Sequence, residues 1–127
     1  MAETIAFELV SPERLLLARP VEMVVVPGTE GDFGVLPRHA PLIAAVRPGV
    51  IAIFEGGKVA ERIFVAGGFA EVTAERCTVL AERAMPVADI DRASVERKLK
   101  DDREAADVAE VAIGEAMLAA LDHPTYH

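Results

Sequence analysis

The feature that most constrains this chain is a change of sequence pattern at Pro86. Before it, apolar residues alternate along short runs, as Ile5, Phe7 and Leu9 do, and a period of two is typical of β-strands. After it, the sequence has no aromatic residue until Tyr126 and is rich in Ala, Glu, Asp, Arg and Lys, which mostly favour helices. The two patterns predict a β + α chain, with a β-domain at residues 1–86 and a two-helix antiparallel hairpin at residues 87–127.

Turn signals divide the first part into short, closely spaced strands. Ser11-Pro12, Pro48-Gly49 and Gly67-Gly68 are typical turn sequences, and Gly56-Gly57 between apolar runs predicts a tight hairpin. Short strands at even spacing are typical of a sandwich or a flattened barrel, and the pattern alone leaves both open.

The second part has the signals of two helices. Asp89 is the predicted cap of the first helix, and Asp91 suits its first turn. Ile113, Met117 and Leu121 are spaced as one face of a second helix, which Pro124 ends, so we expect the turn between the helices near residues 101–107. Because so short a hairpin is marginal alone in water, it must pack on the β-domain, on a partner, or alternate between the two.

Composition excludes several classes of partner. The net charge of −8 and the pI near 4.8 argue against binding to nucleic acid or to anionic lipid headgroups. No apolar run approaches the roughly 20 residues that span a bilayer, so we expect no membrane insertion. The N-terminal residues lack a signal-peptide pattern, and Cys77, the single cysteine, lies in a strand-like run that predicts a buried thiol.

The sequence offers little for catalysis. His39, His123 and His127 are not spaced as metal ligands, and Cys77 has no second cysteine, so we predict neither a metal site nor a bound cofactor. His39 could act as a general base in a small enzyme, but no nucleophile stands beside it. A second alternative is a carrier domain modified at Lys58, which follows the Gly56-Gly57 hairpin.

The segment Pro27–Pro41 is the densest cluster of unusual residues. It combines three glycines with Glu30, Asp32 and an exposed-looking Phe33. The segment lacks the Gly-Lys-Ser/Thr ending of a phosphate loop, and its two acids would repel phosphate. Since loops held by a rigid sheet commonly carry binding residues, we interpret it as a recognition surface.

Several of these motifs together resemble the epsilon subunit of bacterial F-type ATP synthases, which is homologous to the mitochondrial delta subunit. The matching segments occur in the family's order and at its intervals: Val10-Ser11-Pro12-Glu13, the stretch from Pro27 to Leu42, Arg47-Pro48-Gly49, Ala66 to Val72, and Thr78 to Ala81. One such motif would be weak evidence, but the series covers the whole first part of the chain.

The resemblance implies a β-sandwich of about ten strands followed by a helical hairpin. It implies a non-catalytic subunit of the central stalk that binds the gamma subunit and the c-ring, with transient contacts to alpha and beta, and couples proton-driven rotation to ATP synthesis. The implied contact residues at the c-ring and stalk are Glu30, Gly31, Asp32, Phe33 and His39, with His39 at the same end of the sandwich as the acidic pair. The implied location is peripheral, at the cytoplasmic face of the bacterial inner membrane.

The helical part departs from the family at one motif. Many relatives begin the first helix with Ile/Leu-Asp-x-x-Arg-Ala, where ATP can bind, and Ile90 and Asp91 match its start. Ser94 then replaces the arginine, and Arg92 is out of phase by about 200° around a helix. The motif therefore predicts a capped helix start rather than an ATP site. The second helix also carries no Lys or Arg, which predicts weakened inhibition of ATP hydrolysis.

Overall fold

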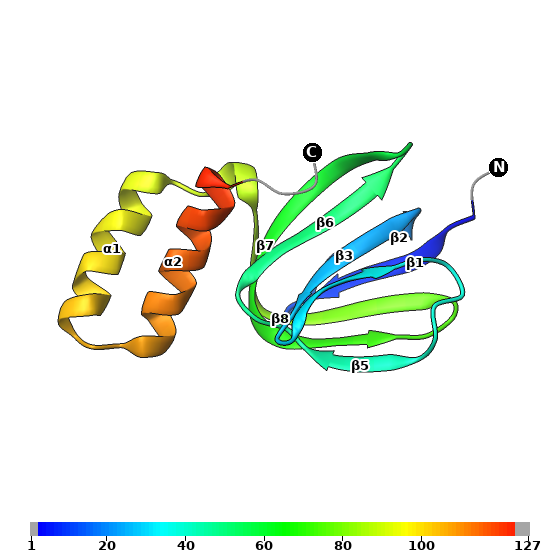
Figure 1. The fold of residues 1–127 in the computed structure, drawn as a ribbon, viewed down its shortest axis with the longest axis horizontal. Helices are drawn as coiled ribbons and strands as arrows, with labels where there is room; N and C mark the ends of the chain where they lie inside the picture. The colour runs from blue at the N-terminus through cyan, green and yellow to red at the C-terminus, as the bar shows by residue number, and fades with distance from the viewer. Residues whose placement is uncertain (1–2, 124–127) are drawn as a thin grey trace.

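The computed structural model describes residues 3–123 as a β-sandwich with a helical hairpin docked on one side (Figure 1). The strands are β1 (Ile5–Val10), β2 (Leu15–Val21), β3 (Met23–Gly28), β4 (Gly31–Val35), β5 (Leu42–Ala45), β6 (Gly49–Glu55), β7 (Lys58–Val72) and β8 (Arg76–Pro86). A 3₁₀ turn, η1 (Val87–Asp89), leads into α1 (Arg92–Glu104) and α2 (Val108–Asp122). The predicted fold class is confirmed. Of the two β-architectures that the sequence pattern left open, the structure is the sandwich and not the flattened barrel.

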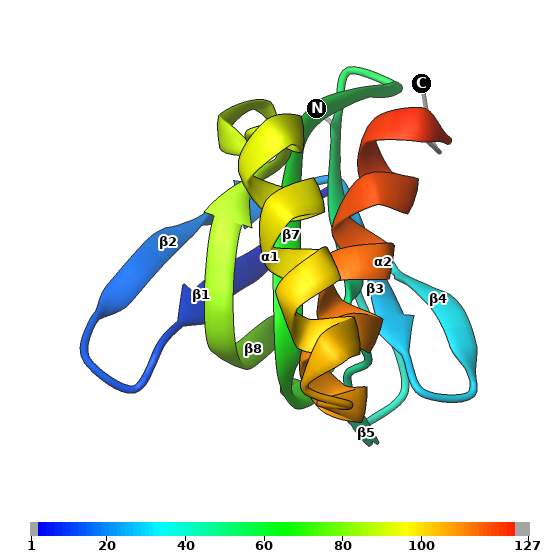
Figure 2. The ribbon, with the colours of Figure 1, turned by 90° about the vertical axis from the view of Figure 1, so that its left-hand side faces the viewer.

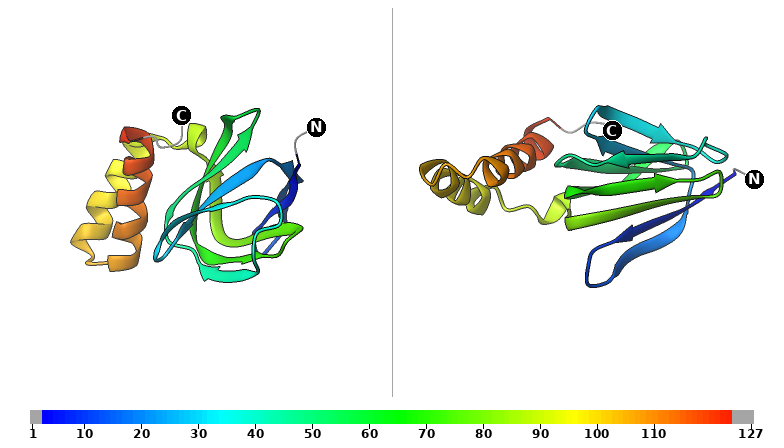
Figure 3. Two further views of the ribbon diagram at one scale, coloured as in Figure 1. Left: turned by 45° about the vertical axis from the view of Figure 1, so that its right-hand side comes forward. Right: turned by 90° about the horizontal axis from the view of Figure 1, so that it is seen from below.

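The described strands number eight, where about ten were expected from the family resemblance. The difference arises because β7 and β8 are long and bend from one layer into the other (Figures 1 and 3). The first half of β7 pairs with β6, and its second half pairs with β5. Strand β1 pairs in parallel with the first half of β8. Each layer therefore contains five strand segments, although residues 3–123 form eight continuous strands.

The bend in β7 falls at Gly67 and Gly68, where a turn between two strands was predicted. The predicted turn is wrong, since β8 pairs with the residues on both sides of Gly67 in a single register and β7 is one continuous strand. Both glycines have positive φ, 72° and 120°, which L-residues rarely adopt. A Cβ at Gly68 would lie 1.8 Å from the carbonyl oxygen of Leu80, so this position requires glycine. The Gly56-Gly57 hairpin was predicted correctly and joins β6 to β7.

The main core lies between the two layers. Phe7, Ile51 and Ile53 are fully buried there, together with the inward-facing valines of β3, β4 and β7. Cys77 is also fully buried, and burial raises the pKa of its thiol to about 12, so the predicted buried thiol is confirmed. At that pKa the nucleophilic thiolate is absent near neutral pH.

The helical hairpin begins two residues later than expected. Asp91, not Asp89, caps α1: its carboxylate accepts a hydrogen bond of 3.2 Å from the amide of Ala93. Asp89 instead ends η1, and Ile90 is extended, so the helix cannot start before Asp91. The turn falls at residues 105–107, within the predicted range, and Asp107 caps α2. Pro124 lies outside the described residues.

The hairpin packs on the outer face of the sandwich through a small apolar cluster. Phe64 and Ala66 of β7 meet Val87, Ile90 and the partly exposed side chains of α2, and Ala120 is buried among them. Helix α2 lies nearer to the strands than α1 in Figure 1, and Figure 2 shows both helices in front of the sandwich. In accordance with this view, most of the helix contacts to β6 and β7 come from α2.

Candidate functional site

The acidic residues of the recognition segment lie on the hairpin between β3 and β4. The turn at Thr29 and Glu30 joins Gly28 to Gly31, which pair across the hairpin. Glu30 and Asp32 are exposed, and Gly31 has a φ of 131°, which favours glycine. The sequence therefore places two carboxylates close together on a tight, solvent-facing turn.

Arg47 anchors this turn to the rest of the sandwich. Its guanidinium donates to the carbonyl oxygen of Gly28 at 2.5 Å and to the Asp32 carboxylate at 2.6 Å. Its backbone amide donates to the carbonyl oxygen of Pro27 at 2.9 Å. Arg47 was not predicted as a site residue, although the Arg47-Pro48-Gly49 motif had been noted in the sequence. Its contacts fix the orientation of the turn and offset the charge of Asp32.

A groove of about 520 Å³ runs between this hairpin and β5. Its walls are residues 28–33 and 42–45. Phe33 is half-buried and packs against the main core, so the prediction that it is exposed was wrong. It lines the groove and is not fully exposed to solvent. The groove can accept a loop of a partner protein beside the two acids.

His39 does not lie with the acidic turn. The amide of Thr29 bonds to the carbonyl oxygen of Ala45 at one end of β5, whereas the amide of Arg38 bonds to Ala74 beyond its other end. The His39 imidazole Nδ1 lies 2.7 Å from the carbonyl oxygen of Ala40. The expectation that His39 shares an end of the sandwich with Glu30 was wrong, because β4 carries the chain away from the turn.

A second candidate surface is an apolar row on the outer face of the other layer. Its members are neighbours on four strands: Ala45 pairs with Phe69, Phe69 with Leu80, and Leu80 with Val10. Phe69 is 58% exposed and Leu80 54%, and Ile43, 71% exposed, lies two residues from Ala45 on the same strand. Contiguous exposed apolar side chains of this kind mark interaction sites. Sequence reasoning missed this row because alternation shows two faces of a strand but not which strands are neighbours.

The candidate nucleotide residues, Ile90 and Asp91, lie at a pocket of about 260 Å³ between the helical hairpin and the sandwich. Ile90 is 8% exposed and belongs to the apolar cluster beneath the helices. The Asp91 carboxylate accepts a hydrogen bond of 2.7 Å from the Ser94 hydroxyl, and this bond holds the pKa of Asp91 below its ordinary value. Both residues thus have structural partners.

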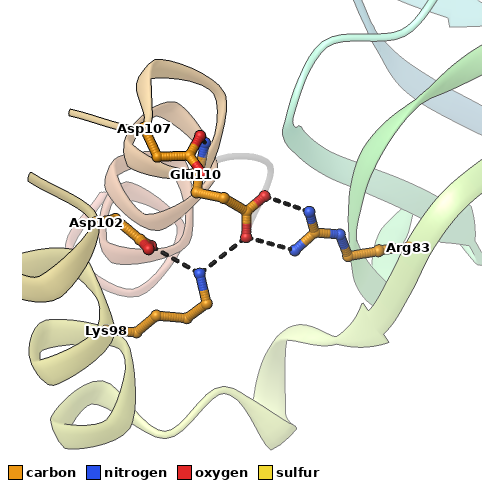
Figure 4. Close-up of polar contacts among 5 residues, drawn as sticks. All are labelled: Arg83, Lys98, Asp102, Asp107 and Glu110. Atoms are coloured by element: carbon orange, nitrogen blue, oxygen red, sulfur yellow. Dashed lines mark hydrogen bonds and ion pairs between the residues drawn. The ribbon is translucent and has the colours of Figure 1, made fainter. Parts of the chain in front are cut away.

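Glu110 joins three elements across the same pocket (Figure 4). Its carboxylate accepts two hydrogen bonds from the Arg83 guanidinium of β8, one of them at 3.1 Å, and a third at 2.8 Å from Lys98 of α1. Lys98 also pairs with Asp102 at 2.7 Å. The bonds from Arg83 and then Lys98 lower the pKa of Glu110 from 4.5 to about 2. We call Arg83, Lys98, Asp102 and Glu110 the ionic bridge.

Within residues 3–123, no group of His, Cys, Asp and Glu side chains is arranged to hold a metal ion. In the same part of the chain, no helix combines the length and apolar character needed to cross a membrane.

Comparison with known proteins identifies the family. Residues 4–87 match the model of the ATP synthase delta/epsilon chain β-sandwich domain. An ATP synthase epsilon chain of Rhodospirillum rubrum is 60% identical over 131 residues, which cover 94% of this chain and 98% of the relative. The epsilon chain of Paramagnetospirillum magneticum is 53% identical over 132 residues, covering 95% and 99%.

Solved structures agree with this assignment. A chain of the Euglena gracilis mitochondrial ATP synthase, in a cryo-EM structure that includes the c-ring, aligns with a TM-score of 0.82 and 25% identity, over 93% of this chain and 81% of that one. A chain from the central stalk and c-ring of the Tetrahymena thermophila mitochondrial ATP synthase shares the fold, with a TM-score of 0.56 and 12% identity over 86% and 95%. The family membership favours the epsilon prediction over a carrier domain modified at Lys58. The chain belongs to the ATP synthase delta/epsilon family, as an epsilon chain, and is a non-catalytic component of the ATP synthase.

Proposed function

We propose that this subunit forms part of the central stalk, where it binds the gamma subunit and the c-ring and couples proton-driven rotation to ATP synthesis. The observation that carries the proposal is the presence of two different interaction surfaces on one rigid sandwich. One is the acidic β3–β4 turn with its groove, and the other is the outer apolar row. A rotor component must hold two partners at once, and a continuous core transmits force between them.

The acidic turn suits the c-ring contact. Glu30, Gly31 and Asp32 present charge and backbone on a turn that Arg47 holds in place. Loops of the ring that carry basic or polar side chains would find complementary charge there, and glycine permits close backbone approach. Phe33 contributes by supporting the groove wall, whereas His39, at the far end of β4, contributes to a different part of the surface.

The apolar row suits the gamma contact. Stable interfaces have an apolar core with few charges, and the row from Ala45 to Val10 has this character on an otherwise acidic molecule. A subunit that binds through this row remains peripheral to the membrane. The proposed location is the cytoplasmic face of the bacterial inner membrane.

The proposal is tested by co-purification with gamma and with the c-ring after substitution of one surface at a time. We expect Leu80→Glu to abolish capture of gamma, because it places a charge at the centre of the row. Val108→Glu is the matched control, since Val108 is 82% exposed at the start of α2, away from the row. Loss of gamma capture in both variants, or in neither, would contradict the assignment.

The c-ring contact has its own test. Reversal of both charges, with Glu30→Lys and Asp32→Lys, should weaken capture of the c-ring and lower proton-driven ATP synthesis while gamma binding persists. Unchanged ATP synthesis in this double variant would remove the turn from the proposal.

The helical hairpin is assigned a minor regulatory role. Helix α2 carries no basic residue, so it offers no positive charge for a contact with the alpha and beta subunits. Deletion of the hairpin should therefore change the ATP hydrolysis rate of the complex only slightly. A large rise in hydrolysis on deletion would show strong inhibition by this member.

A further inference from the structure

The pocket between the hairpin and the sandwich is lined by basic side chains, and each of them is already paired with a carboxylate of the same chain. Arg83 and Lys98 are the basic side chains among its lining residues, and both donate to the carboxylate of Glu110. Lys98 also donates to Asp102. The donors that a phosphate group would need are therefore occupied by carboxylates that come from both helices.

The charge and size of the pocket do not fit a nucleoside triphosphate. Its lining includes four acids, Asp89, Asp91, Asp102 and Glu110, against two bases. Its volume of about 260 Å³ is below the roughly 300–1,000 Å³ typical of drug-sized ligand sites. Three phosphates would enter a site with an excess of negative charge and would have to displace Glu110 from both cations.

We propose that Glu110 acts as an internal anion that holds the helical hairpin against the sandwich, in the position that a bound anionic ligand would otherwise fill. The carboxylate touches β8 and α1 from its own place on α2, so one side chain joins the sandwich to both helices (Figure 4). The folded hairpin of this chain then needs no nucleotide.

The position of Glu110 suits this role. It lies in the first turn of α2, and its backbone amide donates to the Asp107 carboxylate at 3.2 Å, which fixes the start of the helix. A carboxylate near a helix N-terminus is stabilised by the helix dipole. Glu115 lies on the same helix, exposed and outside the lining of the pocket, and so provides a matched control.

The inference is tested by measuring the distance between the hairpin and the sandwich in the full chain. Spin labels at Glu13→Cys, in the β1–β2 loop, and Lys100→Cys, on α1, report the separation; the buried Cys77 stays unlabelled. We expect one short distance in the parent protein, unchanged by millimolar ATP. Glu110→Gln should raise the fraction of long distances several-fold, and Glu115→Gln should not.

High salt provides a second readout, because screening weakens exposed ion pairs. Salt should lengthen the distances of the parent protein but not those of Glu110→Gln. Arg83→Gln is the second variant, and in combination with Glu110→Gln it should add little, as expected of two partners in one contact.

A short distance that persists in both variants would overturn the inference. So would a shift toward short distances when ATP is added to the parent protein, since the hairpin would then depend on a ligand. Capture of gamma and of the c-ring by the sandwich does not enter these measurements, so a failure here is distinguishable from a failure of the proposed function.

Discussion

The sandwich and the helical hairpin are held by different kinds of contact. The sandwich has a continuous core in which Phe7, Ile51 and Ile53 reach zero exposure, and pairing joins all its strands. In the described part of the helices, Leu99 and Ala120 alone are buried. The hairpin is attached by a small apolar cluster and by the ionic bridge.

This difference in contacts determines which part of the molecule can move. Burial of apolar surface stabilises the sandwich by a large free energy that charge screening does not reduce, whereas exposed ion pairs each contribute about 1 kcal/mol or less. The sandwich is therefore a rigid platform for partners, and the hairpin is an attachment that mild changes can release.

The largest effect is expected from Gly68→Ala at the bend of β7. The new Cβ would collide with the backbone of Leu80, and φ at this position is 120°. We expect a loss of about 3 kcal/mol or more in the free energy of unfolding, measured by urea denaturation. Gly57→Ala is the control: its φ is also positive, at 75°, but the site is open, so the cost should be about 1 kcal/mol. Equal losses of unfolding free energy in the two variants would show that the bend at Gly68 does not require glycine more strongly than the open turn at Gly57 does.

Leu99→Ala should destabilise the helical hairpin without destabilising the sandwich. Leu99 is 3% exposed and packs between the helices, where a Cβ added at Gly114 would lie 3.0 Å from its Cδ1. Removing this side chain should cost the hairpin about 3 kcal/mol and leave the sandwich folded. Amide hydrogen exchange is the measurement: protection should fall in α1 and α2 and persist in β6 and β7. Leu99→Met, the control, should retain most of the protection in the helices. An equal loss of amide protection in the helices and in the sandwich of Leu99→Ala would show that the two regions do not unfold separately.

The sequence predicted the succession of strands and then helices well because this succession depends on local periodicity. The strand runs, the Gly56-Gly57 hairpin and the helix turn all follow from neighbours along the chain. The bend at Gly67 and Gly68 was misread as a strand end. Glycines with positive φ occur both where a strand ends and where a strand bends, so the residue types alone do not distinguish the two cases. The resemblance implied about ten strands, and the eight strands here correspond to ten segments because β7 and β8 each pass through both layers.

The sites were harder to predict because they combine distant residues. Glu30 and Asp32 could be predicted because both lie in one segment of the sequence. Arg47, which anchors their turn, lies in the separate connection between β5 and β6. The ionic bridge needs Arg83 and Glu110, 27 residues apart, and no motif marks either one. Ile90 matched a family motif and yet is buried in the apolar cluster, since a motif reports residue types and not the depth at which they lie.

Acid should release the hairpin before it unfolds the sandwich. Glu110 faces Arg83 of β8 and Lys98 and Asp102 of α1, and its pKa is lowered from 4.5 to about 2. Because the docked state favours the charged carboxylate, its contribution is complete above pH 4.5 and is lost as the pH falls toward 2. The label distances should lengthen across this window in the parent protein.

In Glu110→Gln the acid-dependent lengthening should be absent or much smaller. The pair of Arg92 with Asp122, which lowers the pKa of Asp122, lies within the hairpin and does not join it to the sandwich. An identical acid response in the parent and the variant would assign the release to a group other than Glu110.

The smallest effect on stability is expected at the acidic turn, and it sharpens the distinction between platform and contact. Asp32 pairs with Arg47 at 2.6 Å on a half-exposed surface, so Asp32→Asn should lower the free energy of unfolding by at most about 1 kcal/mol. Glu30 forms no ion pair with any residue from 3 to 123, and Glu30→Gln should leave stability unchanged. If the turn is the ring contact, Glu30→Gln should nevertheless weaken capture of the c-ring more than Asp32→Asn does, because Arg47 already offsets the charge of Asp32. If Asp32→Asn instead weakened capture of the c-ring more than Glu30→Gln did, then Asp32, the acid paired with Arg47, would be the one that contacts the ring.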